Sequence, residues 1–294
     1  MTYKLGILFR NIGGLGKMTK NVKLLSLIGI AAALAGGSVA ISNNNNSTVQ
    51  AASITLPAGY TKSAIIKWNQ TGKASKALID ASKKGMKENT NSDAGSDNTL
   101  VNVTKLTASQ QKELSQYTLS LINSARHQLG KQDWTYKRGA LHFANRVANE
   151  YYSHNRSCWD ADHYVTGIER AAKASGLNSK VGQVYEDEAG LPISSTYNTN
   201  LRPMSVLKNQ IYFNVKQMLF GGFAGSDSQM NDSSRYTEWE HAGDLLGCRT
   251  KSYDAKTKYF GISFSGLKGD QSKVSVHMMG VAKCYIQNYR KFNH

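Results

Sequence analysis

The chain has 294 residues, of which 40% are hydrophobic, and a formal net charge of +16. This hydrophobic content is enough for one large domain or two modest ones, and it excludes a wholly disordered protein. Three cysteines are too few for a scaffold held together by disulfides. The basic surplus favours anionic partners, but no dense run of Lys and Arg interleaved with aromatic residues indicates a specific nucleic-acid site.

The first 52 residues have the pattern of a secretory signal region. An apolar run from Leu24 to Ile41 follows Lys20 and Lys23, and a polar stretch after it ends at Ala52. A charged start, an apolar centre and a small-residue cleavage site define a signal peptide. Because Gly36-Gly37 interrupts the apolar run, the pattern favours cleavage over a permanent membrane span.

The leader has a second possible start, and its removal lowers the positive charge of the chain. Met18-Thr19-Lys20 is an ordinary beginning for such a signal, so we interpret Met18 as the true start. The leader holds five basic residues and no acid, which leaves 31 basic and 20 acidic residues, a net charge of +11. We therefore expect a secreted protein without a transmembrane segment, associated with the cell surface through an anionic cell-wall polymer or another surface partner.

Residues 53–105 are rich in Asn, Ser, Thr, Lys and Gly, and their apolar residues come in short pieces such as Ala64-Ile65-Ile66. Only Ala74 to Met86 shows weak helical periodicity. A segment of this kind cannot offset the entropy lost on ordering by burying apolar surface. The composition therefore predicts a largely disordered polar tether with at most one marginal helix.

The character of the chain changes at residue 106, where a folded domain is predicted to begin and to continue to residue 294. Thr107 followed by Gln110 is a capping box that opens a helix, and Gly130 ends this helix. Apolar residues at three- and four-residue spacing predict further helices over residues 139–152, 165–175 and 204–220.

The last part of the chain switches to alternation with a period of two. Apolar and small residues alternate over 259–264 and again over 274–279, with Gly266 to Asp270 between the two runs. This pattern predicts an antiparallel hairpin. Helices followed by strands, without regular strand–helix–strand alternation, favour an α+β sandwich.

The spacing of Cys158, Cys248 and Cys284 matches neither a zinc ribbon nor a Cys-x-x-Cys redox motif. We expect at most one disulfide, and three buried or free thiols fit the sequence equally well.

Three separated segments, 160–164, 183–188 and 237–246, hold the densest groupings of acids and histidines. They supply the candidate cavity or ligand-binding residues His163, Glu186, Glu238, Glu240 and His241. Two imidazoles with one or two carboxylates can bind zinc or another divalent cation, so His163, His241 and Glu186 are the candidate metal ligands. No residue is assigned a catalytic role, because neither His-Glu-x-x-His nor Gly-x-Ser-x-Gly is present.

Structural readings of the same residues stay open. Trp239 is typical of a core anchor, and the acids beside it can be favourable charges at the start of a helix. Asp187 and Glu188 can form a solvated acidic turn. His277 alternates within a strand and fits a hydrogen-bonded structural role.

Several motifs resemble a known family. Leu121-Ile122-Asn123-Ser124-Ala125-Arg126, followed by Leu129-Gly130 and Trp134, resembles the first-helix signature of the CAP superfamily, which includes the cysteine-rich secretory, venom-antigen and pathogenesis-related proteins. The run from Leu106 to the end is similar to the surface exclusion domain of secreted proteins from Gram-positive bacteria. The resemblance implies an α-β-α sandwich whose cavity is lined by His163, Glu186 and His241.

The chain departs from the family pattern at two positions. Tyr185-Glu186-Asp187 stands where the family has Gly-Glu-Asn, and the helix segment from Asn214 to Met218 lacks the carboxylate that the family often places there. Glu238 or Glu240 could take the place of that missing acid.

Two functions follow from these observations. The first is a secreted, wall-associated CAP-like binding module that modulates contact between cells, as in surface exclusion, or adhesion. The second is a metal-dependent hydrolase of a peptide or cell-wall substrate, with His163 and His241 as ligands and Glu186 as base or third ligand. Fold alone does not decide between them, and the sequence favours the binding module over an enzyme.

Overall fold

The computed structural model describes residues 52–91, 97–249 and 257–293. The predicted signal region, residues 1–52, lies outside this part except for Ala52, as does the proposed start at Met18. Within the described ranges, no helix combines the length and the apolar character that a membrane crossing requires.

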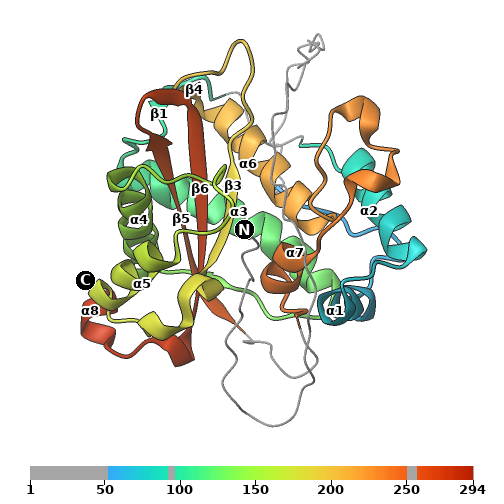
Figure 1. The fold of residues 1–294 in the computed structure, drawn as a ribbon, viewed down its shortest axis with the longest axis horizontal. Helices are drawn as coiled ribbons and strands as arrows, with labels where there is room; N and C mark the ends of the chain where they lie inside the picture. The colour runs from blue at the N-terminus through green and yellow to red at the C-terminus, as the bar shows by residue number, and fades with distance from the viewer. Residues whose placement is uncertain (1–51, 92–96, 250–256, 294) are drawn as a thin grey trace, which may run out of the picture.

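A four-stranded sheet with the order β2-β5-β6-β3 forms the centre of the molecule (Figure 1). Its strands are β2 (Thr135–Tyr136), β3 (Glu186–Gly190), β5 (Lys258–Leu267) and β6 (Asp270–Ala282). The predicted hairpin is confirmed, because β5 and β6 pair antiparallel along most of their length. β3 continues the sheet antiparallel to β6, and β2 adds a short parallel edge beside β5.

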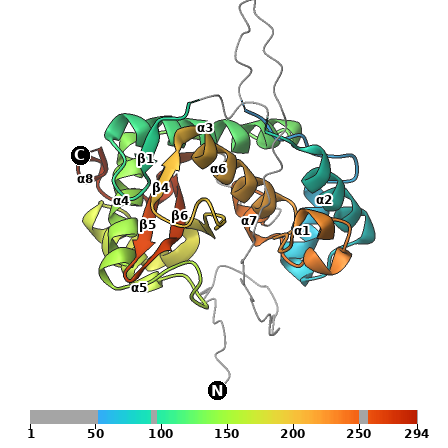
Figure 2. The same cartoon turned by 90° about the horizontal axis from the view of Figure 1, so that it is seen from above.

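Helices cover both faces of this sheet (Figures 1 and 2). On one face lie α4 (Arg138–Ser153), α5 (Val165–Ala174) and the short α8 (Tyr289–Asn293); on the other lie α3 (Ala108–Gln128) and α6 (Met204–Leu219). In β6, Val276 and Met278 belong to the core on the α3 and α6 side, and Met279 and Val281 to the core beside α4. The predicted α-β-α sandwich is confirmed.

Local chemistry explains where these elements begin and how closely they pack. The Thr107 side chain accepts a hydrogen bond from the Gln110 amide, and the Gln110 side chain accepts one from the Thr107 amide, so the predicted capping box opens α3. A Cβ atom on Gly261 of β5 would lie 2.5 Å from the backbone of Leu141 in α4. Only glycine lets α4 rest this close to the sheet.

The segment predicted as a disordered tether is folded where it is described, so that prediction is wrong for residues 53–91 and 97–105. It contains α1 (Lys62–Thr71), α2 (Lys76–Glu88) and β1 (Leu100–Asn102), and β1 pairs antiparallel with β4 (Leu201–Pro203). Ile54, Ile65, Leu78 and Met86 are completely buried in the same core as α3 and α6.

Packing against α6 and α7 (Glu240–Leu245) orders this segment. The rings of Trp68 and Trp239 lie 5.7 Å apart, and the Trp239 indole N–H donates to the Ser82 hydroxyl at 3.2 Å. The Lys216 ammonium donates to the carbonyls of Met86 and Asn89 at the end of α2, where the helix dipole favours a positive charge. The expectation that Trp239 anchors the core is confirmed, since its side chain is fully buried.

The remaining described segments are loops and short 3₁₀ turns. Single turns occupy Asp227–Gln229, Ser233–Arg235 and Lys283–Tyr285, and Ser179–Tyr185 contains two, separated by a kink at Gly182. None of the three cysteines forms a disulfide within the described residues; Cys248 is buried, Cys158 half-buried and Cys284 exposed.

Candidate functional site

Strand β3 carries three consecutive acids, Glu186, Asp187 and Glu188, whose side chains are at most 6% exposed. Successive side chains of a strand point to opposite faces of the sheet. Since Glu188 pairs with His277 and Asp187 with Met278, the two glutamates face α4 and α5, whereas Asp187 faces the α6 and α7 side. The alternative of a solvated acidic turn is therefore excluded, and the acids form two separate clusters.

The first group, named here the Glu186 cluster, consists of Tyr151, His163, Glu186, Glu188 and His277. One oxygen of Glu186 accepts from His277 Nδ1 at 2.7 Å. The other accepts from His163 Nδ1 at 2.7 Å and from the Tyr151 hydroxyl at 2.8 Å. The Tyr151 hydroxyl also lies 3.2 Å from an oxygen of Glu188. The two glutamates are therefore held by side chains from a loop, from α4 and from β6.

The protons in this cluster follow from what a carboxylate can do. Glu186 can only accept, so both imidazoles must present Nδ1–H to it. In His277 this leaves Nε2 as an acceptor, which takes the hydroxyl proton of Ser265 at 2.8 Å. In His163, whose side chain is 22% exposed, Nε2 makes no hydrogen bond within the described residues, so this ring atom remains available.

Burial and hydrogen bonding push the two glutamates apart in acidity. Burial alone would raise the pKa of Glu186, but the hydrogen bonds from His163 and His277 hold its pKa well below the ordinary value. Burial, and then the charge on Glu186, raise the pKa of Glu188 well above its ordinary value. The surroundings therefore favour the ionised form of Glu186 and the protonated form of Glu188, which is the arrangement of a carboxylate pair with divided acid and base character.

His163, Glu186 and Glu188 are also the residues best placed to hold a cation. One ligand atom from each lies within 4.8 Å of the others. Oε1 of Glu188 is buried and has no hydrogen-bond partner in the described part of the chain. One imidazole nitrogen and carboxylate oxygens form a donor set that suits zinc or a similar divalent cation, so these residues fit the expected metal by chemistry.

The second group, named the His241 cluster, lies across β3 and consists of Asp187, Glu238, His241, Asp244 and Arg249. His241 Nδ1 donates to Asp187 at 2.9 Å. Arg249 forms two hydrogen bonds to the Asp244 carboxylate, at 2.8 and 2.9 Å. The side chain of His241 is 25% exposed, so the outer edge of its ring reaches solvent.

Electrostatics make His241 a cation at neutral pH. Burial would lower the pKa of His241, but Glu238, Asp187 and Asp244 together raise it to about 9. Burial raises the pKa of Glu238 and of Asp187, and His241 acts against both increases. The cluster is therefore a half-buried positive charge held among acids, with a different character from the carboxylate pair on the other face.

The structure brings some of the predicted site residues together and separates others. His163 and Glu186 are in direct contact, and His241 lies with Glu238 across the strand. The group of possible metal-ligating side chains found among the described residues contains Glu188 in place of the predicted His241. Glu238 accepts a hydrogen bond from the Glu240 amide and so caps α7, while the Glu240 side chain makes no hydrogen bond or ion pair within the described ranges.

Sequence reasoning did not select Tyr151, Glu188 or His277 for this site. His277 stands among apolar residues of a strand, and a fully buried imidazole in such a run needs partners for both nitrogens. That signal was visible in the sequence, but the identity of the partner depends on the register that places His277 opposite Glu188.

The α-β-α sandwich, with His163 and Glu186 joined at the sheet edge, is a CAP-like fold. Among solved structures, this fold is similar to the CAP domain of enterococcal PrgA, with a TM-score of 0.60 and 22% sequence identity. The similarity covers 81% of this chain and 89% of that chain. Residues 106–294 are only 189 of the 294 residues, so the matched region extends upstream of residue 106 and includes part of the segment predicted as a tether.

Neither the protein-family models nor the curated proteins contain a match to this chain. At 22% identity, the structural similarity establishes the fold and leaves the function to be argued from the site.

Proposed function

We propose that the protein is a secreted, cell-surface-associated binding module of the CAP type, which modulates contact between cells, as in surface exclusion, or adhesion. The observation that carries this proposal is the similarity to the CAP domain of enterococcal PrgA over most of both chains. The resemblance of residues 106–294 to surface exclusion domains points in the same direction. The signal pattern of residues 1–52 supports export of the chain.

The contacts inside the Glu186 cluster favour binding over turnover. All three hydrogen bonds to Glu186 come from side chains of the protein itself. They attach the loop that carries His163 to β3 and β6. A carboxylate that accepts three hydrogen bonds from the protein holds this surface in shape, and His163 Nε2 is an atom that the arrangement leaves to a ligand.

The partner at the surface is an anionic cell-wall polymer or another surface component, without specific nucleic-acid recognition. The net charge of +11 expected for the exported chain supports this class of partner, because a basic protein outside the cell is attracted to polyanions. Attraction of this kind between exposed charges weakens as salt screens it.

Binding to whole cells tests the proposal. The purified protein is incubated with Gram-positive cells at low and at high salt, and the bound fraction is measured after sedimentation. We expect saturable binding that declines with salt, and donor–recipient contact that falls when the protein is present on the recipient. Absence of binding at every salt concentration would reject the proposed function.

A second candidate function is a metal-dependent hydrolase of a peptide or cell-wall substrate. The observation that favours it is the buried Oε1 of Glu188 beside His163 and Glu186, which accepts no hydrogen bond from the described residues. A divalent cation held by these residues would supply a water molecule acidic enough to attack at neutral pH. Glu186 or Glu188 would then act as a ligand or as the base that takes the proton.

Elemental analysis separates the two candidates. If the site holds zinc, the purified protein contains one zinc ion per chain, H163A and E188Q lose it, and H241A keeps it, because His241 lies with Asp187 on the other face. Cleavage of a cell-wall peptide that disappears with the zinc would establish the hydrolase. Wild-type protein that takes up no zinc from solution would remove this candidate and leave the binding module.

A further inference from the structure

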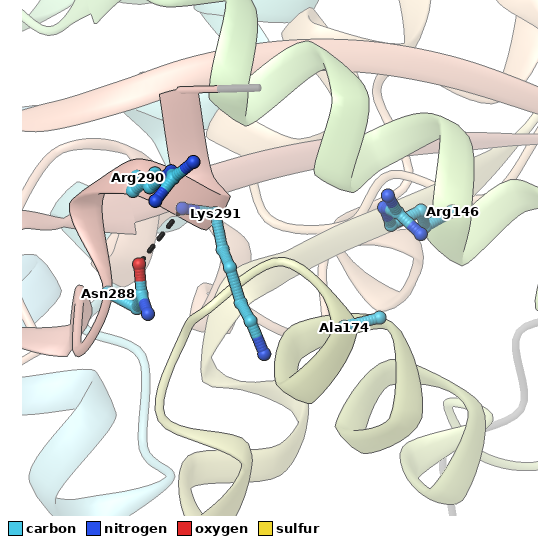
Figure 3. Close-up of a pocket in the computed structure, with 5 residues that line it drawn as sticks. All are labelled: Arg146, Ala174, Asn288, Arg290 and Lys291. Atoms are coloured by element: carbon cyan, nitrogen blue, oxygen red, sulfur yellow. Dashed lines mark hydrogen bonds between the residues drawn. The ribbon is translucent and has the colours of Figure 1, made fainter.

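A pocket of about 520 Å³ lies between α4, the end of α5 and the C-terminal segment (Figure 3). It is lined by Arg146, Ala174, Asn288, Arg290 and Lys291. Three of these five residues are cations, and none is an acid. The pocket shares no residue with the Glu186 cluster or the His241 cluster, so it is a separate feature of the surface.

The fold holds the walls of this pocket in place. The carbonyl of Gly176, just after α5, accepts hydrogen bonds from the amides of Gln287 and Asn288, both at 2.9 Å. The Asn288 side chain accepts a hydrogen bond from the Lys291 amide at 3.0 Å. Phe292 is 1% exposed and anchors α8 in the core, so the backbone that carries the cations is fixed before any ligand arrives.

The cations around the pocket pair with no acid of the described ranges. The side chains of Arg146, Arg290 and Lys291 are exposed and form neither an ion pair nor a hydrogen bond within the described residues. The neighbouring Arg170 differs, because it is paired with Glu150 at 2.7 Å. In Figure 3, Arg146 faces the pocket from α4, and Arg290 and Lys291 lie on the opposite side. Three unpaired positive charges around one hollow create a positive potential that an anion relieves.

The residue types indicate which anion fits. A guanidinium group presents a planar fork of donors that matches two oxygens of a phosphate, and a lysine adds a point charge. Each contact is exposed to water and contributes little by itself. A chain with repeated phosphate groups overcomes this, because a second group binds at high effective concentration once the first is held.

We propose that this pocket binds the phosphodiester groups of an anionic polymer at the cell surface. The inference rests on the proposed cell-surface function, since that function brings the protein to such polymers. It adds the location of the contact and the chemistry of the partner. The Glu186 and His241 clusters take no part in it.

The test compares two triple variants with equal loss of charge. R146Q/R290Q/K291Q removes the cations of the pocket. K62Q/K67Q/K73Q removes three exposed lysines on and beside α1, which lies at the opposite end of the molecule from α8 (Figures 1 and 2). Binding of fluorescently labelled poly(glycerol phosphate) to each purified protein is measured by anisotropy, and circular dichroism checks that both variants are folded.

We expect the pocket variant to bind the polymer about tenfold more weakly, because three exposed charge pairs are lost. The affinity of the α1 variant should stay within about twofold of the wild type, because its three lost charges lie far from the pocket. The two variants have the same net charge, so a difference between them reports the position of the charges. An equal loss of polymer affinity in the two variants would show that only the overall charge matters, and it would overturn the proposal. No loss in the pocket variant would also overturn it.

Two further probes separate the phosphodiester polymer from other anions. Poly-γ-glutamate offers carboxylates only, and we expect it to bind more weakly than poly(glycerol phosphate) and with no difference between the variants. Vesicles of phosphatidylglycerol in phosphatidylcholine offer the same phosphodiester on a lipid. If the pocket variant loses vesicle binding and keeps polymer binding, the pocket serves a membrane surface and the polymer proposal is wrong.

Failure of the pocket can be told apart from failure of the proposed function. Pocket-dependent polymer binding without binding to cells would reject the cell-surface function and keep the pocket as a phosphodiester site. Binding of the pocket variant to cells and polymer as strongly as the wild type would reject the pocket and leave the cell-surface function standing.

Discussion

Replacement of Glu186 by alanine tests whether this one carboxylate holds the site together. Its side chain is completely buried and accepts three hydrogen bonds, from His163, His277 and Tyr151. Alanine leaves these donors without an acceptor, and His277 is fully buried, away from bulk water. Removal of one partner from a buried charged network typically costs about 3–5 kcal/mol, and we expect E186A to lose this much unfolding free energy.

Glutamine at the same position should cost much less. Its oxygen can take the place of the one that accepts from His163 and Tyr151, and its amide group then faces His277. The imidazole of His277 can adapt by moving its proton to Nε2 and donating to Ser265, whose hydroxyl can also accept. Every hydrogen bond is then kept without the charge, so the expected loss for E186Q is about 1–2 kcal/mol.

Urea unfolding at pH 7, followed by tryptophan fluorescence, measures both values as shifts of the midpoint at constant slope. E169A in α5 is the control, because the Glu169 side chain forms no ion pair within the described residues and its loss should cost under about 0.5 kcal/mol. Equal losses for E186A and E186Q would refute the tautomer argument. A loss below about 1 kcal/mol for E186A would refute the view that this network stabilises the fold.

Three further changes test other parts of the structure. The pKa of His241 is raised to about 9, above the ordinary 6.5, so its stabilising contribution is complete below pH 6.5 and is lost as pH rises through 9. The unfolding free energy of the wild type should therefore fall by up to about 3 kcal/mol over this pH range, and that of H241Q by much less. Urea unfolding at each pH measures both, and the same pH dependence in the two proteins would contradict the raised pKa. A Cβ at Gly85 would lie 2.4 Å from the Phe220 ring, so G85A should destabilise the fold by about 1–3 kcal/mol although alanine favours helices. K84A on the exposed face of α2 is the control, and stabilisation by G85A would disprove the packing of α2 on α6. K216M should cost about 1–3 kcal/mol, because it leaves two buried carbonyls of the α2 end unpaired, and an unchanged thermal midpoint would argue against those contacts.

Elements with strong local signals could be predicted from the sequence. The capping pair Thr107 and Gln110, Gly130 just after α3 and the alternation in β5 and β6 each act within a few residues, and the structure places the expected element at each. Helices α1 and α2 carry weaker signals, because lysines and polar residues occupy their outer faces. The surfaces that bury Trp68 and Met86 come from α6 and α7, more than one hundred residues later, so no local pattern could reveal them.

The candidate site was predictable in its residue types but not in its arrangement. Glu186 is bound by His163, 23 residues upstream, and by His277, 91 residues downstream. Three acids in a row indicate a polar turn unless partners elsewhere neutralise them, and those partners depend on the strand order. For the same reason the sequence could not show that His241 joins Asp187, since the choice of face alternates with each residue of β3.

The acids of β3 also fix the alignment of an edge strand. β3 has one neighbour, β6, and helices with apolar surfaces cover both faces of the sheet. A strand of valines and isoleucines would fit such surroundings in either of two alignments, because each face accepts apolar side chains. A slip of one residue in β3 would turn Glu186 and Glu188 into the apolar side and leave His277 facing Asp187. The buried charges thus allow only one register between β3 and β6, and this register fixes the position of the loop that carries His163.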